Sequence, residues 1–421
     1  MRRLFLLLAA CAAFPLQAQT VPAGASFDEW LAAFRQEAVE KGISPATLDS
    51  ALTGMMPIER VVELDTRQPE FQQTFADYIA RRVTEKRVAQ GIQLAQDHAA
   101  LLDAVERKYG IPRSVLLAFW GLETNYGSFL GNLNIPAALA TLAYDGRRSQ
   151  FFRSQLLDAL RIIDDGHVLA VDMKGSWAGA MGQMQFMPGT FRAYAIDGDG
   201  DGRIDVWQSL PDAMYSAANY LQQAGWRANE PVALTLRLPE NFDFAQASVD
   251  NRLPVTEWQA RGVLQADGTF LPTTGSRAAI VLPQGWLGPA FMVFDNFDVV
   301  MRWNRSVNYA LSVAQLANQI AGASPLPAWM GDATVLSIAE LKALQHSLNE
   351  LGYNAGTPDG LVGPRTQQAI RMYQVVHNLP ADGYPSPSVL AHVGQRYAAA
   401  IAADQAPRGD EWVAPNTDDR P

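Results

Sequence analysis

The stretch "SVLLAFWGLETNYGSF", residues 114–129, joins an apolar helix to an abrupt polar end. Apolar side chains cover nearly every face of its first part, so the pattern predicts a buried helix. Pro112 suits the first turn of that helix. Glu123 lies at the C-terminal end, and Asn, Tyr and Gly follow it directly. The stretch therefore predicts a carboxylate placed where a buried helix ends.

This position has a chemical consequence for Glu123. Burial disfavours the charged carboxylate, and the negative end of the helix dipole does the same, so we expect both effects to raise its pKa. A carboxylic acid with a raised pKa can act as a general acid. The plain alternative is a solvated glutamate at a helix end, and position alone does not separate the two interpretations.

Composition limits the class of protein. The chain has 421 residues, of which 48% are hydrophobic and 18% charged, so it can bury more than one globular core. Its formal net charge is −10 and no basic stripe offsets the acidic balance. These features argue against nucleic acid as a partner and against a general affinity for anionic lipid.

The N-terminus, "MRRLFLLLAACAAFPLQAQT", has the layout of a secretory signal, and we expect cleavage after Ala18, which makes residues 1–18 a signal peptide. The box "LAAC" allows an alternative in which Cys11 becomes the lipidated first residue. Cys11 is the only cysteine. The mature chain is therefore expected to have no disulfide, no cysteine nucleophile and no cysteine metal site.

The rest of the chain divides by pattern into a long core and a small module. Three- and four-residue apolar spacing predicts helices over residues 27–110, and helices broken by glycine-rich loops follow to residue 226. The segments "PVALTLRLP" and "RAAIVLP" predict strands, and the pattern from "FDVVMRW" onward is helical again. The predicted boundaries are a core at 27–322, a linker at 323–335, a module at 336–396 and a disordered tail at 397–421.

A second motif, "GSWAGAMGQMQFMPGTF" at residues 175–191, is dense in small residues. Small residues let the backbone approach a ligand closely, and Gln185 offers an amide in apolar surroundings, as sugar sites often do. A tight contact between two helices would also explain the small residues, and composition does not decide between them.

A third motif, "DGDGDGRID" at residues 197–205, predicts a calcium loop of the EF-hand type. The twelfth position holds Gln208 in place of the usual Glu, so the closing carboxylate must come from elsewhere. The predicted ligands are the carboxylates of Asp197, Asp199, Asp201 and Asp212 and the backbone carbonyl of Arg203. The expected role of calcium is structural, and a plain Asp/Gly turn is the alternative.

With "GLETNYG", "GSWAGAMGQMQFMP" and "RWNRSVNYAL" in this order, residues 27–322 resemble the lytic murein transglycosylase B family of peptidoglycan-cleaving enzymes. The resemblance implies a mainly α protein with a lysozyme-like helical catalytic core and a small inserted β region. It also implies an EF-hand-like calcium site and no organic cofactor. Glu123 is then the single catalytic acid and base.

The resemblance also implies roles for further residues of the expected site. It implies that Ser176 and Asn304 hold and polarise the carboxyl group of Glu123. Trp303 stands where the family usually has a tyrosine, so a hydroxyl group is missing there. The expected substrate-binding residues are Gln185, Tyr220, Arg147, Arg148, Tyr78 and Trp303.

A chemical route with one carboxylate follows from the family's reaction. Protonated Glu123 donates to the glycosidic oxygen between N-acetylmuramic acid and N-acetylglucosamine. The carboxylate then takes a proton from the C6 hydroxyl of the same sugar, which attacks C1 and closes a 1,6-anhydro ring. Two alternatives stay open: a non-catalytic wall-binding scaffold, and a hydrolytic muramidase in which Asp145 or Asp172 is the second acid.

The segment at residues 341–390 resembles the small helical peptidoglycan-binding module of cell-wall enzymes, through a "GY…DGLVGPRT" turn between two helical stretches. Pro385 and Pro387 stand where a second glycine-containing turn is usual. The alternative is a helical bundle that only caps the core. We expect peptidoglycan glycan strands as the partner, a membrane anchor only through a lipid on Cys11, and a periplasmic location, with an outer-membrane lipoprotein as the alternative.

Overall fold

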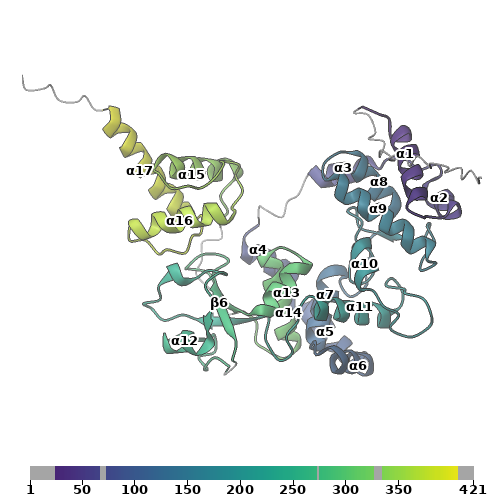
Figure 1. Ribbon diagram of the computed structural model, residues 1–421. Coiled ribbons are helices and arrows are strands. Elements are labelled where there is room, and N and C mark those ends of the chain that lie inside the picture. Colours follow the sequence, from purple (N-terminus) through teal and green to yellow (C-terminus); the bar gives the residue numbers. More distant parts are fainter. Residues whose placement is uncertain (1–23, 67–72, 273–274, 327–333, 406–421) are drawn as a thin grey trace, which may run out of the picture. The chain divides into compact units, whose positions relative to one another are not determined.

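The computed structural model describes residues 24–66, 73–272, 275–326 and 334–405, so the expected signal peptide lies outside the described residues. The chain divides into two compact units, which are described one by one. Helices dominate both units, and the mainly α fold class is confirmed (Figure 1). None of the described helices is long and apolar enough to cross a membrane.

The first unit contains the described residues up to Thr66 together with residues 130–193. Helix α1 begins with a capping box, in which the side chains of Ser26 and Glu29 each accept a hydrogen bond from the other residue's backbone N–H. Helix α8 packs against α9, and the short strands β1 and β2 pair in antiparallel fashion. Its elements are α1 (Phe27–Glu40), α2 (Pro45–Leu52), α3 (Glu59–Thr66), β1 (Leu133–Asn134), α8 (Ile135–Tyr144), α9 (Ser149–Asp164), β2 (Lys174–Gly175) and most of α10 (Pro188–Tyr194).

A buried carboxylate, Asp65, holds two arginines in this unit. Arg147 Nε donates to Asp65 Oδ2 over 2.8 Å, and an Arg148 Nη atom donates to Asp65 Oδ1 over 2.5 Å. The hydrogen bond from Arg147 is the main cause that lowers the pKa of Asp65, while burial opposes it. The Asp65 side chain is inaccessible to solvent, whereas about half of each arginine side chain is exposed. Asp65 therefore fixes two half-exposed cationic groups.

The helical part of the second unit is built around α7 (Arg113–Thr124), the buried helix that the sequence predicts. Helices α14, α5 and α6 pack against it. Gly110, in the left-handed conformation, ends α6. The other helices are α4 (Phe75–Arg82), α5 (Glu85–Asp97), α6 (Ala99–Tyr109), α11 (Leu210–Gln223), α13 (Asp295–Trp303) and α14 (Val307–Ile320).

The end of α7 is shaped by a tight chain reversal. Asn125 and Tyr126 both have positive φ, and the Tyr126 hydroxyl donates to the backbone oxygen of Arg87 over 2.8 Å. The Tyr126 ring thereby folds back onto Gly121, where an added Cβ would lie 2.7 Å from the ring. Only glycine leaves room for this ring, so "GLETNYG" fixes the place where the helix stops.

A five-stranded antiparallel sheet with the order β4-β6-β7-β3-β5 forms the inserted β region. Both predicted strands are confirmed, as β3 and β6. Strand β7 escaped prediction because "AFMV" is buried at every position and shows no alternation. The elements are β3 (Ala233–Arg237), the 3₁₀ helix η2 (Phe244–Gln246), β4 (Leu253–Pro254), α12 (Val255–Ala260), β5 (Leu264–Gln265), β6 (Arg277–Val281) and β7 (Ala290–Val293).

The C-terminal module consists of α15 (Ile338–Glu350), α16 (Pro364–Val376) and α17 (Pro387–Gln405). Its two turns repeat one arrangement. In the first, the buried Gln345 accepts from the backbone N–H of Gly360 over 2.8 Å and donates to Asp359. In the second, the buried Gln374 accepts from Gly383 over 2.8 Å and donates to Asp382 over 2.7 Å.

Two expectations for this module are wrong. A second glycine-containing turn is present at Asp382–Gly383, directly before the two prolines, because Gln374 supplies the same hydrogen bonds as Gln345 does in the first turn. Residues 397–405 belong to α17 and not to a disordered tail. The segment "YAAAIAAD" is rich in alanine, the strongest helix former, and its helix propensity explains the longer helix.

The pairing of Asp65 with two arginines predicts a pH-dependent contribution to stability. A carboxylate whose pKa is lowered by folding stabilises the protein above its unfolded pKa, about 3.9, and this contribution is lost as pH falls through the folded pKa. We expect Asp65→Asn to lower the free energy of unfolding by about 1–3 kcal/mol at pH 7, and by much less at pH 3. Urea unfolding followed by circular dichroism measures both values.

The matched control is Asp172→Asn, which removes an exposed carboxylate from the same unit and should change stability little at either pH. If Asp65→Asn lowers the free energy of unfolding equally at pH 7 and pH 3, the charge of the carboxylate contributes nothing to stability.

Candidate active site

Glu123 lies in the last turn of α7 and is half-buried. Two side chains donate hydrogen bonds to the same carboxylate oxygen, Oε1. The indole Nε1–H of Trp303 donates over 3.0 Å, and the hydroxyl group of Tyr309 is the second donor. The junction between α13 and α14 therefore brings two donors to the end of α7.

Aromatic rings surround this carboxylate. The centroid of the Trp303 ring lies 4.5 Å from that of Phe119, which is fully buried, and 4.9 Å from that of Tyr220. Tyr194 meets the edge of Tyr220 at 4.8 Å. The structure thus places two of the expected residues, Trp303 and Tyr220, in one ring cluster beside Glu123.

Tyr309 is the residue of this group that sequence reasoning missed. It is buried, and burial is the first cause that raises its pKa well above the usual value, with the negative charge of Glu123 next. Both effects favour the protonated hydroxyl, which is the form that donates to Glu123. The missed signal is Ser306, whose hydroxyl caps α14 and accepts from the Tyr309 N–H, which places the tyrosine in the first turn of that helix.

Tyr78 and Asn304 lie in the same unit as Glu123. Tyr78 is buried on α4 and is close enough to Tyr309 to contribute to the raised pKa of Tyr309. Asn304 ends α13, and its backbone oxygen accepts from the N–H of Ser306 over 2.8 Å. Asn304 therefore shapes the junction from which Trp303 and Tyr309 reach Glu123.

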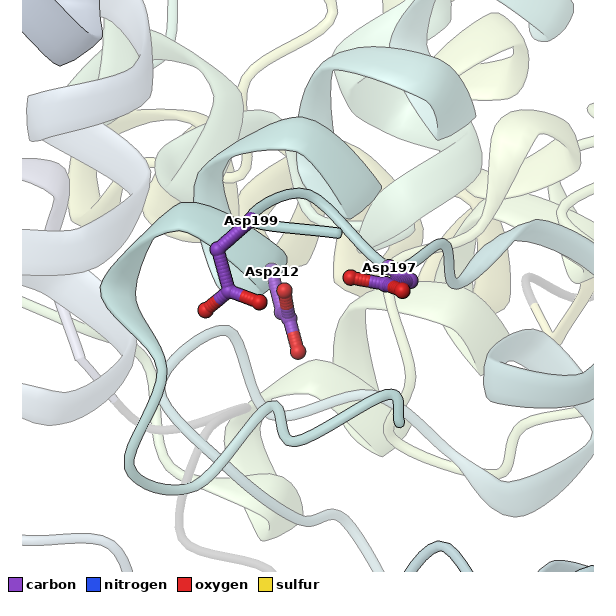
Figure 2. A group of neighbouring side chains, drawn as sticks. All are labelled: Asp197, Asp199 and Asp212. Carbon is purple, nitrogen blue, oxygen red and sulfur yellow. The ribbon is translucent and has the colours of Figure 1, made fainter. Parts of the chain in front are cut away.

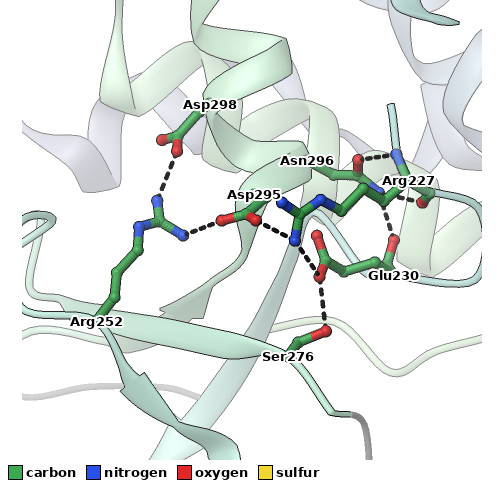
Figure 3. Close-up of polar contacts among 7 residues, drawn as sticks. All are labelled: Arg227, Glu230, Arg252, Ser276, Asp295, Asn296 and Asp298. Carbon is green, nitrogen blue, oxygen red and sulfur yellow. Dashed lines mark hydrogen bonds and ion pairs between the residues drawn. The ribbon is translucent and has the colours of Figure 1, made fainter. Parts of the chain in front are cut away.

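The start of α13 is anchored by a network of charged and polar groups (Figure 3). Arg252 donates to Asp295 over 3.1 Å and to Asp298 over 2.8 Å, and Arg227 pairs with Asp295. Asn296, fully buried, donates to the backbone oxygen of Arg227 over 2.8 Å. Two aspartates in the first turn also suit the helix dipole. The network fixes the helix whose far end carries Trp303.

Four expected site residues, Ser176, Gln185, Arg147 and Arg148, lie in the first unit. The Ser176 hydroxyl accepts from the backbone N–H of Ala180 over 3.0 Å. The Gln185 side chain donates to the backbone oxygens of Leu130 and Gly182 over 3.2 Å and 3.0 Å. The two arginines are held by Asp65 as described above. The roles that the resemblance implies for these four residues stay predictions.

The small residues around Ser176 allow two parts of the backbone to lie very close together. An added Cβ at Gly175 would lie 2.2 Å from the backbone oxygen of Ala180. Met181 bridges to both Gly175 and Phe186, so the segment folds back in turns. The interpretation as a contact between two helices is wrong for residues 175–187, which contain no helix, whereas Gly189 at the start of α10 does lie against Gln155 of α9.

The aspartate loop brings three of the predicted ligands together (Figure 2). One carboxylate oxygen from each of Asp197, Asp199 and Asp212 lies within 4.8 Å of the others. Asp212, at the start of α11, is buried and accepts from the N–H groups of Gly198 and Asp205 over 2.8 Å and 2.6 Å. Three hard oxygen donors at this spacing fit Ca²⁺.

Asp201 lies outside this group of three, and the predicted ligand role of the Arg203 backbone carbonyl stays a prediction. Both residues are exposed, and the Asp201 carboxylate accepts from the backbone N–H of Arg203 over 2.8 Å. The Arg203 side chain pairs with Asp205 over 2.8 Å. Asp197 is set for a ligand role by the loop itself, since N–H groups of Gly202 and Gly200 donate to it and Gly202 is the main cause that lowers its pKa.

Known proteins match the chain over both of its parts. Residues 26–318 match the family described as the transglycosylase SLT domain, and residues 337–393 match a peptidoglycan binding domain. Membrane-bound lytic murein transglycosylase B of Escherichia coli K12 is 31% identical over 258 residues, which are 58% of this chain and 66% of that protein. The chain thus spans just under two thirds of that relative's length.

Two solved structures extend the comparison. SltB3 from Pseudomonas aeruginosa, in complex with NAG-anhNAM-pentapeptide, is 43% identical with a TM-score of 0.85, over 88% of this chain and all of that chain. The lytic transglycosylase Slt35 of Escherichia coli, in complex with calcium, is 27% identical with a TM-score of 0.59, over 69% of this chain and 92% of that one. The match of more than half the chain, with a glutamate held in an aromatic cluster, shows that this chain belongs to the SLT transglycosylase family and carries a C-terminal peptidoglycan-binding domain.

Proposed function

We propose that the chain is a lytic transglycosylase that cleaves the β-1,4 bond between N-acetylmuramic acid and N-acetylglucosamine in peptidoglycan. The observation that carries the proposal is the placement of Glu123, whose Oε1 accepts from Trp303 and Tyr309 within a cluster of aromatic rings. The complex of SltB3 with a NAG-anhNAM-pentapeptide supports this substrate class.

Glu123 serves first as an acid and then as a base. Its proton goes to the glycosidic oxygen, the bond from C1 to that oxygen breaks, and the N-acetylglucosamine side leaves as an alcohol. The N-acetyl group of the muramic acid stabilises the positive charge that develops at C1. The carboxylate then takes the C6 hydroxyl proton while the C6 oxygen bonds to C1, so Glu123 regains its proton and no water is consumed.

One carboxylate is enough because the nucleophile belongs to the sugar that is cleaved. A well-oriented intramolecular reaction reaches effective molarities of about 10⁵ M or more, so a second protein nucleophile is dispensable. Hydrolytic glycosidases usually need a second carboxylate to activate water or to attack the sugar.

Glu123→Gln tests the assignment. The amide has nearly the same shape but can neither donate nor accept the transferred proton, so we expect the chain to fold normally and wall-cleaving activity to fall by about 10³-fold or more. Release of soluble muropeptides from isolated walls measures the loss. Glu257→Gln, which changes a partly exposed glutamate in the same unit, is the control and should keep full activity. Wild-type turnover by Glu123→Gln would remove Glu123 from the mechanism.

Calcium is proposed as a structural ion of the aspartate loop. Asp197, Asp199 and Asp212 would hold it through carboxylate oxygens, and bound calcium would neutralise charges that otherwise repel one another. The calcium complex of Slt35 supports the proposal. The ion would fix the start of α11, the helix that carries Tyr220 in its last turn.

A calcium titration of metal-free protein is the test. Because an ion that binds only the folded state stabilises it by mass action, we expect the melting temperature to rise with calcium concentration in the wild type and not in Asp199→Ala. Asp267→Ala changes an exposed aspartate in another Asp-Gly turn and should leave the calcium-dependent rise intact. If calcium does not change the melting temperature of the wild type, the proposed calcium site is wrong.

The C-terminal module is proposed to bind the insoluble wall and to keep the catalytic core, residues 27–322, on its polymeric substrate. Two contacts join it to the β region. Arg371 donates to the backbone oxygen of Ala247 over 2.8 Å, and the N–H of Trp286 donates to Asp382 over 2.9 Å. Within the second unit, the module therefore contacts the β region and is not only tethered to it.

Removal of the residues after 322 separates wall binding from cleavage. Because retention on a polymer raises the effective substrate concentration, we expect the truncated chain to lose activity on insoluble walls far more than on short soluble fragments. Pelleting with walls is best compared in the Glu123→Gln background, full-length and truncated, since no cleavage then releases the protein. An equal loss of activity on both substrates would instead show that the catalytic core needs the module to fold.

Export to the periplasm is proposed from the N-terminal segment and from the wall substrate. Cleavage after Ala18 gives a soluble periplasmic enzyme, whereas lipidation of Cys11 gives an outer-membrane lipoprotein. The mass of the mature chain purified from cells distinguishes the two.

A further inference from the structure

The two turns of the C-terminal module share one arrangement around an aspartate. In the first turn, Oδ1 of Asp359 accepts from the side chain of Gln345 over 3.2 Å and from the N–H of Leu361 over 2.8 Å. In the second turn, Oδ1 of Asp382 accepts from the equivalent glutamine over 2.7 Å and from the backbone N–H two positions later over 2.9 Å. Each aspartate also stands at the same distance before the proline that begins the next helix. The two turns are therefore repeats of one structural unit.

The second oxygen of each aspartate distinguishes the two turns. Oδ2 of Asp382 accepts from the backbone N–H of Trp286 over 2.9 Å, so a peptide group of the β region occupies the second turn. Among the described residues, no group donates to Oδ2 of Asp359, and this side chain is exposed. The second turn is thus occupied from within the chain, whereas the first offers the same acceptor to an outside donor.

The peptide on the second turn has a backbone conformation that L-residues rarely adopt. Gly285, which precedes the donor Trp286, has a φ of 72°. A Cβ added there in the L configuration would lie 2.8 Å from Oδ2 of Asp382 and 3.1 Å from Cβ of Tyr384. Glycine avoids both the left-handed strain and this clash. A D-residue favours positive φ for the same steric reason that an L-residue avoids it, so the second turn holds a peptide in a conformation natural to a D-residue.

We propose that the first turn of the module, at residues 359–361, binds a peptide N–H group next to a D-residue in the stem peptides of peptidoglycan. The inference rests on the proposed wall-binding function of the module and adds the chemical group that the module recognises. Stem peptides contain D-amino acids, whereas ordinary proteins do not. A turn that holds a left-handed peptide therefore distinguishes the wall from proteins.

The surroundings of the first turn fit a short peptide. Leu361 and Val362 follow Gly360 directly, and Ile338 lies against Gly360, where an added Cβ would be 2.7 Å from its Cγ2. All three apolar side chains are exposed and can contact the methyl groups of alanine residues. The N–H of Leu361 is the main cause that lowers the pKa of Asp359, so the acceptor is charged at neutral pH and forms the stronger, charge-assisted kind of hydrogen bond.

Asp359→Asn tests the acceptor. The amide oxygen can still accept from Gln345 and Leu361, while the amide nitrogen puts a donor in place of Oδ2, so the turn is kept and the proposed contact is lost. Asp267→Asn is the matched control. It changes an exposed Asp-Gly turn of the β region in which the aspartate also accepts from the N–H two positions later, over 2.9 Å.

Pelleting with insoluble walls is the first arm of the test, with every chain in the Glu123→Gln background. We expect Asp359→Asn to bind walls about tenfold more weakly than its parent, and Asp267→Asn to bind like the parent. Removal of the stem peptides from the walls by an amidase should weaken binding of the parent and abolish the difference between the parent and Asp359→Asn.

Competition by soluble peptides is the second arm, and it leaves the turn unchanged. The probe is a stem pentapeptide, and its matched control is the diastereomer in which every D-residue has the L configuration. We expect the stem pentapeptide to release the Glu123→Gln chain from walls, and the diastereomer to need an at least about tenfold higher concentration for the same release. This result does not depend on how well Asp359→Asn folds.

Equal wall binding by Asp359→Asn and its parent would overturn the inference, and so would equal competition by the two peptides or no competition by either. A failure of the proposed wall-binding function looks different, because removal of the residues after 322 would then leave pelleting in the Glu123→Gln background unchanged.

Discussion

The hydrogen bonds from Trp303 and Tyr309 to one oxygen of Glu123 join the helices that form the candidate active site. They require three helix ends to lie close together: the last turn of α7, the end of α13 and the start of α14. Each end is fixed by a local device. The fold of Tyr126 onto Gly121 stops α7, and the cap of Ser306 starts α14.

Two more distant parts of the second unit support the same contact. The ion network at Asp295 and Asp298 fixes the start of α13, nearly a full helix away from Trp303. The aspartate loop fixes the start of α11 through Asp212, and the last turn of α11 carries Tyr220 to the edge of Trp303. A structural ion in that loop would therefore act on the site through one helix, without contact with the reaction.

Much of this arrangement could be predicted from the sequence, and the failures have physical reasons. Glu123 and Asp212 were found because each stands beside a local signal, a buried helix end in one case and a series of spaced aspartates in the other. Tyr309 and Asp65 were missed because their roles come from residues far away in the sequence: Tyr309 meets Glu123 across 186 positions, and Asp65 meets Arg147 across 82. No periodicity marks such partners. Strand β7 and the last turns of α17 were missed for local reasons, uniform burial and high alanine content.

The missing tyrosine at position 303 shows how a departure from a family pattern can be compensated. The sequence indicates that a hydroxyl group is lost there, whereas the structure shows that the indole N–H of Trp303 donates to the same carboxylate that serves as the proposed acid. The exchange keeps a donor and removes an acceptor.

In the proposed reaction, one glutamate and the sugar's own C6 hydroxyl complete the cleavage without water. Digestion of isolated walls in water enriched in heavy oxygen, followed by mass spectrometry of the muropeptides, tests it most directly. We expect 1,6-anhydromuramic ends that are lighter by one water than reducing ends and that carry no heavy oxygen. Reducing ends that contain the solvent label would contradict it, because they require an activated water molecule and a second acid, as in a hydrolytic muramidase.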